Sequence, residues 1–252
     1  MAIRPYKSLM LRNIKIEIEY DGTNFSGWQV QPKLRTVQGE IENKLKRVLG
    51  EKIKLVSAGR TDVGAHALGQ VANFKTISKL NLDSIFCGLN SILPEDIVIK
   101  NMKEVDFDFN SRYDAISRVY RYRIYLGRTA LLRNHVWQLG YDVKISDIVK
   151  ATEKILGKND FSSFCVAKSS KKNNFCNVIY ASWKKRKEEL IFEIKADRFL
   201  HSMVRILVGT LMDAGRGYFS LADFEEILKS KDRKKAGKTA PACGLYLVKV
   251  NY

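Results

Sequence analysis

One acidic side chain stands apart from its neighbours in the first third of the chain. Asp62 is the only carboxylate between Glu51 and Asp83, and lysines and arginines flank it on both sides. A carboxylate in basic surroundings can serve as a nucleophile or as a general base toward an anionic substrate. The segment around it, GRTDVGAH, also fits a purely structural turn, because Gly and Asp both favour tight turns. Asp62 is therefore a candidate catalytic residue with a structural alternative.

The sequence lacks the motifs that several kinds of enzyme chemistry require. GRTDVGAH is not a phosphate-binding loop, because Ala65 stands where that motif requires lysine. The chain has no GxGxxG fingerprint and no H-x-E with C-x-x-C, so nucleotide-cofactor chemistry and zinc-dependent deamination are disfavoured. The cysteines and histidines are scattered without metal-ligand spacing, at Cys87, Cys165, Cys176, Cys243, His66, His135 and His201. We expect no metal and no cofactor.

The charge balance predicts a polyanionic partner. The chain carries 44 Lys plus Arg against 27 Asp plus Glu, for a net charge of +17, and nucleic acid fits best. A generally lysine-rich proteome is the alternative. Two stretches of the chain contain no acidic residue. The first has five arginines among tyrosines, namely Arg118, Arg121, Arg123, Arg128 and Arg133 among Tyr120, Tyr122 and Tyr125. The second has Lys168, Lys171, Lys172 and the basic run 184–187. Arginine with tyrosine suits RNA, while the lysines fit a phosphate track or a solvated loop equally well.

The hydrophobic pattern predicts the elements that must position Asp62. Residues 14–20 alternate as a half-buried strand, and a helix follows from Val37, with Thr36 placed to cap it and Gly50 to end it. Strands at 53–58 and 69–74 then enclose the loop 59–65 that carries Asp62. A helix at 82–92, stopped by Pro94, and a strand at 97–102 complete the order β-α-β-β-α-β.

The second part of the chain repeats this order. We expect strands at 116–126, 136–140, 177–183, 190–196 and 245–250, and helices at 146–156, 199–214 and 221–229. The predicted fold class is α+β, with two ferredoxin-like β-α-β-β-α-β halves joined into one mostly antiparallel mixed sheet, helices packed on it and a basic RNA-binding cleft. Residues 1–12 would form an N-terminal tail, 13–110 the half with the Asp62 loop, and 111–252 the half that completes the cleft.

The sequence favours a cytoplasmic protein. No apolar run is long enough to span a bilayer, and the first ten residues lack the apolar stretch and cleavage site of a signal peptide. We expect no membrane association.

Eight sequence blocks, in order from about Asn13 to Tyr252, resemble the tRNA pseudouridine synthase A family. They are YDGTNFSGWQVQP (20–32), TVQGEIENKL (36–45), GRTDVGAHALGQVANF (59–74), LNSILPEDI (89–97), SRVYRYRIY (117–125), NDFSSF (159–164), FLHSMVRILVG (199–209) and TAPACGLYLVKV (239–250). The departures are mild. Val63 and Ala65 stand where the family more often has Ala and Val, and Asn73 where His is common.

The resemblance implies a cofactor-free isomerase that converts uridine to pseudouridine at positions 38, 39 and 40 of the tRNA anticodon stem-loop. It also implies a homodimer whose subunits share one tRNA. By the same analogy, Asp62 is the essential carboxylate, Arg205 pairs with it, and Tyr120 packs against the target base. Arg60 would help to hold the flipped nucleotide, and Leu245 would be an apolar neighbour of the base.

Besides the turn already considered for Asp62, three of the other residues have an ordinary structural role open to them. Arg205 fits a surface arginine on an amphipathic helix, Tyr120 a half-buried cross-strand aromatic, and Leu245 a core residue. Two alternatives to an enzyme also remain. Paired ferredoxin-like sheets could form a non-catalytic RNA-binding protein, which would lack the usual aromatic signature, and a basic DNA-binding protein would lack a recognition helix.

Overall fold

The computed structural model describes residues 11–166 and 173–252. Its first half contains β1 (Arg12–Tyr20), α1 (Val37–Leu49), β2 (Val56–Ser57), β3 (His66–Thr76), α2 (Leu82–Ile92) and β4 (Ile97–Val105). Its second half contains β5 (Ser117–Leu126), β6 (Trp137–Leu139), α3 (Ile145–Glu153), β7 (Gly157–Asp160), β8 (Phe175–Arg186), β9 (Glu189–Ala196), α4 (Met203–Gly215), α5 (Leu221–Ser230) and β10 (Leu245–Asn251). Within each half, the core order is the predicted β-α-β-β-α-β.

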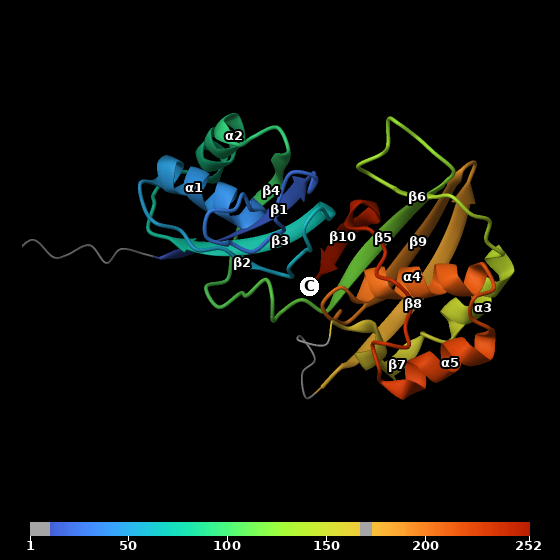
Figure 1. Cartoon of the computed structure of the whole chain (residues 1–252). Coiled ribbons are helices and arrows are strands. Elements are labelled where there is room, and N and C mark those ends of the chain that lie inside the picture. The colour runs from blue at the N-terminus through green and yellow to red at the C-terminus, as the bar shows by residue number, and fades with distance from the viewer. Residues whose placement is uncertain (1–10, 167–172) are drawn as a thin grey trace, which may run out of the picture.

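The described strands form a single mixed sheet. Their order is β4-β1-β3-β10-β5-β9-β8-β7, with β2 added beside β3 and β6 beside β5. The pairs β10–β3 and β5–β6 are parallel, and the other described pairs are antiparallel. Helices α1 and α2 lie over the N-terminal strands, and α3, α4 and α5 lie against the C-terminal strands (Figure 1). The predicted α+β fold with a mostly antiparallel mixed sheet is confirmed.

Strand β10 joins the two halves. It runs parallel to β3, with Tyr246 opposite His66 and Leu247 opposite Ala67, and antiparallel to β5, with Leu247 opposite Tyr120. Its end brings the C-terminus to the middle of the molecule (Figure 1). The two halves therefore share one sheet through the last described strand of the chain.

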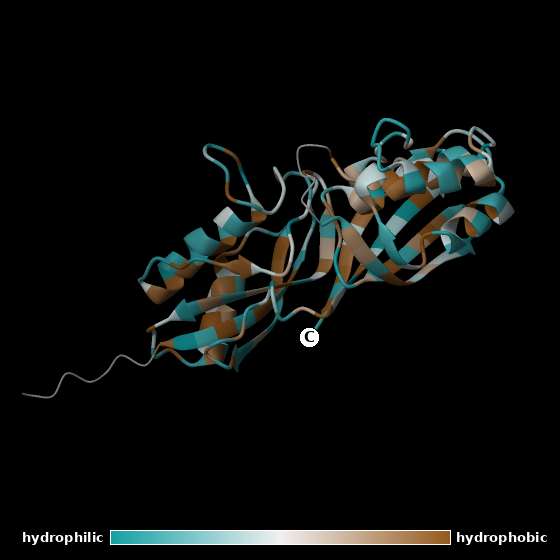
Figure 2. Cartoon of the chain, turned by 90° about the horizontal axis from the view of Figure 1, so that it is seen from below, coloured by the Kyte–Doolittle hydropathy of each residue, from teal (hydrophilic) through white to brown (hydrophobic). Residues whose placement is uncertain are grey.

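The strand register keeps one face of the sheet buried across this seam. Tyr20 lies opposite Ala67, and Ala67 lies opposite Leu247. All three are buried, as is Tyr120 opposite Leu247. Along the strands, hydrophobic and hydrophilic residues alternate (Figure 2), as expected for a sheet with one covered face. Among the described residues, no helix combines the length and apolar character needed to cross a membrane.

Local signals in the sequence fix the first helix as predicted. Thr36 has extended backbone and its Oγ1 accepts a hydrogen bond from the Gly39 amide at 3.3 Å. Gly50 adopts a left-handed conformation, with φ of 71°, and donates its amide hydrogen to the Lys46 carbonyl. A threonine N-cap is a standard start signal of a helix, and a left-handed glycine at the C-terminal end is a standard stop signal.

Several predicted boundaries differ from the structure, and one strand is not predicted. The strand expected at 53–58 is reduced to Val56–Ser57, and the strand expected from 69 begins at His66. The helix expected from 199 begins at Met203. Strand β7 was not predicted, because its sequence, GKND, has no apolar alternation. It forms by pairing with β8, a partner that local sequence does not reveal.

Replacing Gly209 with Ala is expected to destabilise the protein. Gly209 lies in α4, and a Cβ there would stand 1.8 Å from the Lys238 carbonyl oxygen, so one backbone segment must move. We expect a loss of about 3 kcal/mol, or a melting temperature lower by about 6–12 °C, measured by thermal unfolding. Gly88→Ala in α2 is the matched control, because its Cβ would meet Val48 at an ordinary 3.7 Å. Equal melting temperatures for the two variants would contradict this account.

Candidate active site

The loop that carries Asp62 is held by the segment that follows β1. The Trp28 amide donates to the Thr61 carbonyl at 3.2 Å, and the Gly64 amide donates to the Phe25 carbonyl at 3.4 Å. Gly27 permits this close approach, because it has φ of 86° and a Cβ there would lie 2.9 Å from the Thr61 carbonyl oxygen. Two sequence blocks separated by about thirty residues thus combine into one rigid support for Asp62.

Asp62 contacts three side chains from the start of α4. Its Oδ2 accepts a hydrogen bond from Arg205 Nη1 at 2.6 Å and another from Ser202 Oγ at 2.8 Å. Its Oδ1 lies 3.5 Å from His201 Nε2. The Asp62 side chain is 16% exposed, so it is shielded on most sides but still open to a reactant. A carboxylate this shielded needs the adjacent cation to offset lost hydration.

Arg205 is oriented by the backbone as well as by Asp62. Its Nε donates to the Ala240 carbonyl at 2.8 Å, and the Ala240 amide donates to the Arg205 carbonyl at 3.1 Å. The guanidinium is therefore fixed between the TAPACGLYL block and the Asp62 loop. This placement excludes the alternative of a surface arginine extended toward solvent.

Tyr120 lies on β5 beside the same loop. Its ring packs edge-to-face against Phe199, with centroids 5.0 Å apart, and only 9% of the residue is exposed. Burial, with a further contribution from the Asp62 charge, raises the pKa of Tyr120 to about 12. The phenol is therefore protonated throughout the physiological pH range.

The other two candidate residues differ in their placement. Leu245 is 6% exposed and lies opposite Tyr122 at the start of β10, a position that also fits its alternative as a core residue. Arg60 is exposed, two residues before Asp62. The structure thus brings Asp62 and Arg205 into direct contact, with Tyr120 close by.

The arginine and tyrosine cluster of β5 is mostly used inside the protein. Arg118 donates to four backbone carbonyls, and burial lowers its pKa. Arg121 pairs with Glu193 and Arg123 with Glu189. Spacing along one strand does not reveal the acids on the neighbouring strand that pair with Arg121 and Arg123, and the suitability of this cluster for RNA stays a prediction.

Other basic residues do remain at the surface. Arg128 and Arg133 are exposed in the loop after β5, and 184–187 lie exposed where β8 turns toward β9. Lys168, Lys171 and Lys172 lie outside the described residues. The basic cleft expected from the sequence stays a prediction.

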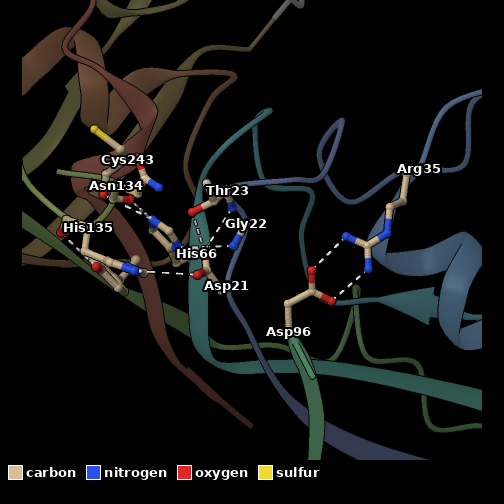
Figure 3. Close-up of polar contacts among 10 residues, drawn as sticks. Asp21, Gly22, Thr23, Arg35, His66, Asp96, Asn134, His135 and Cys243 are labelled. Atoms are coloured by element: carbon tan, nitrogen blue, oxygen red, sulfur yellow. Dashed lines mark hydrogen bonds and ion pairs between the residues drawn. The ribbon is translucent and has the colours of Figure 1, made fainter. Parts of the chain in front are cut away.

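Two histidines and an acid form a cluster that includes His66, the first residue of β3 (Figure 3). Candidate ligand atoms of Asp21, His66 and His135 lie within 4.8 Å of one another, a spacing that a metal ion could bridge. However, His66 Nδ1 accepts the Gly22 amide hydrogen at 3.0 Å, so its lone pair is already used. His66 Nε2 faces the Asn134 and Cys243 carbonyls, each at 3.1 Å. The buried His66 ring therefore connects Gly22 in the first half with Asn134 and Cys243 in the second half.

Sequence reasoning missed two residues of the site, His201 and Ser202. Both fall within the apolar pattern that placed the helix start at 199. A signal was available for Ser202, because serine directly before Met203 and Val204 is a typical N-cap residue. Reading it as a cap would have started the helix at 203 and left Ser202 outside it.

Comparison with known proteins decides the family. A family model described as tRNA pseudouridine synthase matches residues 16–114 and 151–252. The chain belongs to the tRNA pseudouridine synthase family. Its members are isomerases that act on RNA, and this chain is one of them. The resemblance inferred from the eight sequence blocks is confirmed, and the two binding-only alternatives lose their support.

Individual members of the tRNA pseudouridine synthase family match nearly the whole chain. tRNA pseudouridine synthase A of Acetivibrio thermocellus and that of Caldicellulosiruptor saccharolyticus are each 46% identical over 244 residues, covering 96% of this chain and 100% of each relative. The enzyme of Clostridium acetobutylicum is 41% identical with the same coverage. Among solved structures, a Cbf5-Nop10-Gar1 complex covers 93% of this chain and 58% of that chain, with 11% identity and a TM-score of 0.39.

Proposed function

We propose that this enzyme isomerises uridine to pseudouridine at positions 38, 39 and 40 of the tRNA anticodon stem-loop, with Asp62 as its essential carboxylate. The observation that carries the proposal is the Asp62 constellation. A partly exposed carboxylate is held by Arg205 and Ser202 in a chain that is 46% identical to two relatives named tRNA pseudouridine synthase A.

The reaction rearranges bonds without adding or removing atoms overall. The bond between ribose C1′ and uracil N1 breaks, a bond between C1′ and C5 forms, C5 loses a proton and N1 gains one. Asp62 would act either as a nucleophile toward the sugar or base, or as a base that removes a ribose proton. A single carboxylate suits this rearrangement better than hydrolysis, which generally uses two.

The target nucleotide must leave the stem-loop before it can reach Asp62. Extruding a base costs a few kcal/mol, and contacts around the site must offset that cost. We propose that Tyr120 packs against the extruded base, that Leu245 is an apolar neighbour of the base, and that Arg60 helps to hold the nucleotide out of the stack. Of these, Tyr120 is tied most closely to the site, because the Asp62 charge contributes to its raised pKa.

The direct test is tritium release from C5-labelled uridine in unmodified tRNA. Forming the C1′–C5 bond expels the C5 hydrogen, so the purified protein should release tritium without added cofactor and with a chelator present. Mapping pseudouridine in tRNA from cells that lack the protein should show loss at positions 38, 39 and 40. Release of tritium from other positions only would refute the proposed target, and no release at all would refute the activity.

The affinity for tRNA is expected to fall steeply with salt. Exposed cations such as Arg128, Arg133 and those at 184–187 would displace counterions from phosphates. Each duplex-like phosphate contact should contribute a slope of ~0.9 in log Kd against log salt. Filter binding between about 50 and 200 mM salt measures the slope. A flat profile would contradict an electrostatic RNA surface.

Tyr120 is expected to act through its ring and not through its hydroxyl. Its pKa of about 12 keeps the phenol protonated well above neutral pH, so it supplies no phenolate base. Tyr120→Phe should therefore keep the single-turnover rate within about 10-fold and leave the pH–rate profile unchanged between pH ~6 and ~9. Tyr120→Ala should lose about 5- to 150-fold, because stacking is worth about 1–3 kcal/mol per base. A Phe variant as slow as the Ala variant would give the hydroxyl a chemical role.

We further propose that the enzyme works as a cytoplasmic homodimer. The support for a dimer is the family resemblance, which implies two subunits that share one tRNA. Light scattering on the purified protein should give about twice the chain mass of 28.8 kDa, and a monomer at working concentration would refute the dimer.

A further inference from the structure

Ser202 has a backbone conformation that is unfavourable for its residue type. Its φ of 57° and ψ of 13° place it in the left-handed region, which residues with a Cβ enter only at a cost. The other described non-glycine residues with positive φ are Lys33, Lys187 and Lys231, and all three are exposed. Ser202 is half-buried at the site. Unfavourable backbone held at such a place calls for an explanation in terms of function.

The hydroxyl of Ser202 also does not make the hydrogen bond that is usual for a serine at the start of a helix. A serine at the N-cap normally accepts a hydrogen bond from an amide in the first turn, but Ser202 makes no side-chain cap to α4. Ser220, in the same half, shows the ordinary arrangement, because its side chain accepts from the Asp223 amide in a reciprocal capping box. The Ser202 hydroxyl donates instead to Asp62 Oδ2 at 2.8 Å.

The two oxygens of Asp62 are consequently unequal. Oδ2 accepts short hydrogen bonds from both Ser202 and Arg205. Oδ1 has a longer contact, 3.5 Å to Nε2 of His201, and the His201 side chain is itself 54% exposed. Two donors on one oxygen fix the rotation of the carboxylate, and Oδ1 is left with a longer contact to an exposed side chain.

We propose that Ser202 is a positioning residue that locks Asp62 Oδ2 and thereby presents Oδ1 as the oxygen that meets the nucleotide. This inference rests on the proposed function of Asp62. The left-handed backbone places the Ser202 hydroxyl over Asp62 where a capping conformation would turn it toward the helix. At the start of α4, the Ser202 hydroxyl thus orients the Asp62 carboxylate and does not cap the helix.

Three substitutions separate the hydroxyl from the backbone. Ser202→Gly relieves the backbone but removes the donor. Ser202→Ala removes the donor and keeps the strain. Ser202→Asn tolerates the left-handed conformation and supplies an amide donor. We expect the Gly and Ala variants to lose ~10- to 100-fold in single-turnover tritium release with tRNA Kd unchanged, and the Asn variant to regain a rate within about threefold of wild type.

Ser220→Ala is the matched control, because it removes an N-cap serine that does cap its helix. It should lower the melting temperature and leave the rate unchanged, whereas Ser202→Ala should lower the rate and barely change the melting temperature. Wild-type rates in both Gly and Ala variants, an Asn variant no faster than Ala, or rate losses matched by losses in tRNA affinity would overturn the role of Ser202. A wild-type protein that releases no tritium would overturn the proposed function itself, and with it this inference.

Discussion

Replacing Asp62 with Asn is expected to reduce tritium release from C5-labelled tRNA by at least ~10³-fold, equivalent to ~4 kcal/mol of transition-state stabilisation. Asparagine has the same shape, and its amide oxygen can still accept from Ser202 and Arg205, which hold Oδ2 in the native protein. It lacks the negative oxygen that would react as nucleophile or base. The variant should therefore fold and bind tRNA normally while failing in the chemical step.

Asp96 offers the matched control for this experiment. It also pairs with an arginine, because Arg35 donates to both its oxygens at 2.7 and 2.9 Å, and its side chain is 22% exposed against 16% for Asp62. The pair is visible beside the histidine cluster (Figure 3). Asp96→Asn should keep wild-type tritium release. Retained activity in Asp62→Asn, or equal losses in both variants, would remove Asp62 from its proposed role.

Replacing Arg205 with Met is expected to cost ~10²- to 10³-fold in the single-turnover rate. The substitution keeps an unbranched apolar stem but leaves a mostly shielded carboxylate without its cation and the Ala240 carbonyl without its donor. Arg205→Lys should recover only part of the rate, because one ammonium group cannot reproduce the fixed fork that joins Ala240 and Asp62.

A double-mutant cycle tests whether Arg205 acts through Asp62. If it does, Asp62→Asn combined with Arg205→Met should be no slower than Asp62→Asn alone. Arg35→Met is the control for the loss of an arginine pair, since Arg35 pairs with Asp96 elsewhere on the surface. Independent, multiplying losses in the double mutant would show that Arg205 contributes by a separate route, such as contact with RNA.

The parts of the fold that follow from local chemistry could be predicted from the sequence. Thr36 and Gly50 bound α1 because capping depends on neighbouring residues only, and the period-two pattern of β1 and β9 reflects one covered face. The junction of the two halves could not be predicted from local sequence, because the parallel pairing of β10 with β3 joins residues about 180 positions apart. Nothing in either segment alone specifies its partner.

The candidate site likewise combines features that the sequence shows with contacts that it does not show. The isolation of Asp62 among basic residues is visible in the sequence, and the family resemblance pointed to Arg205. The contact of Ser202 with Asp62 spans 140 positions and depends on how α4 packs against the Asp62 loop. Similarly, the acids that neutralise Arg121 and Arg123 lie on β9. Such contacts are products of tertiary packing, which periodicity does not describe.

The central place of β10 has a consequence for synthesis on the ribosome. Strands β3 and β5 flank it in the finished sheet, yet β10 is translated after every other described strand. Until it emerges, the segments of β3 and β5 that pair with β10 keep an open edge, and open edges are prone to pair with other chains. Nascent chains stalled just before residue 245 should therefore be the species that most needs chaperone protection, and they cannot yet bring the Asp62 loop and α4 together through a shared sheet.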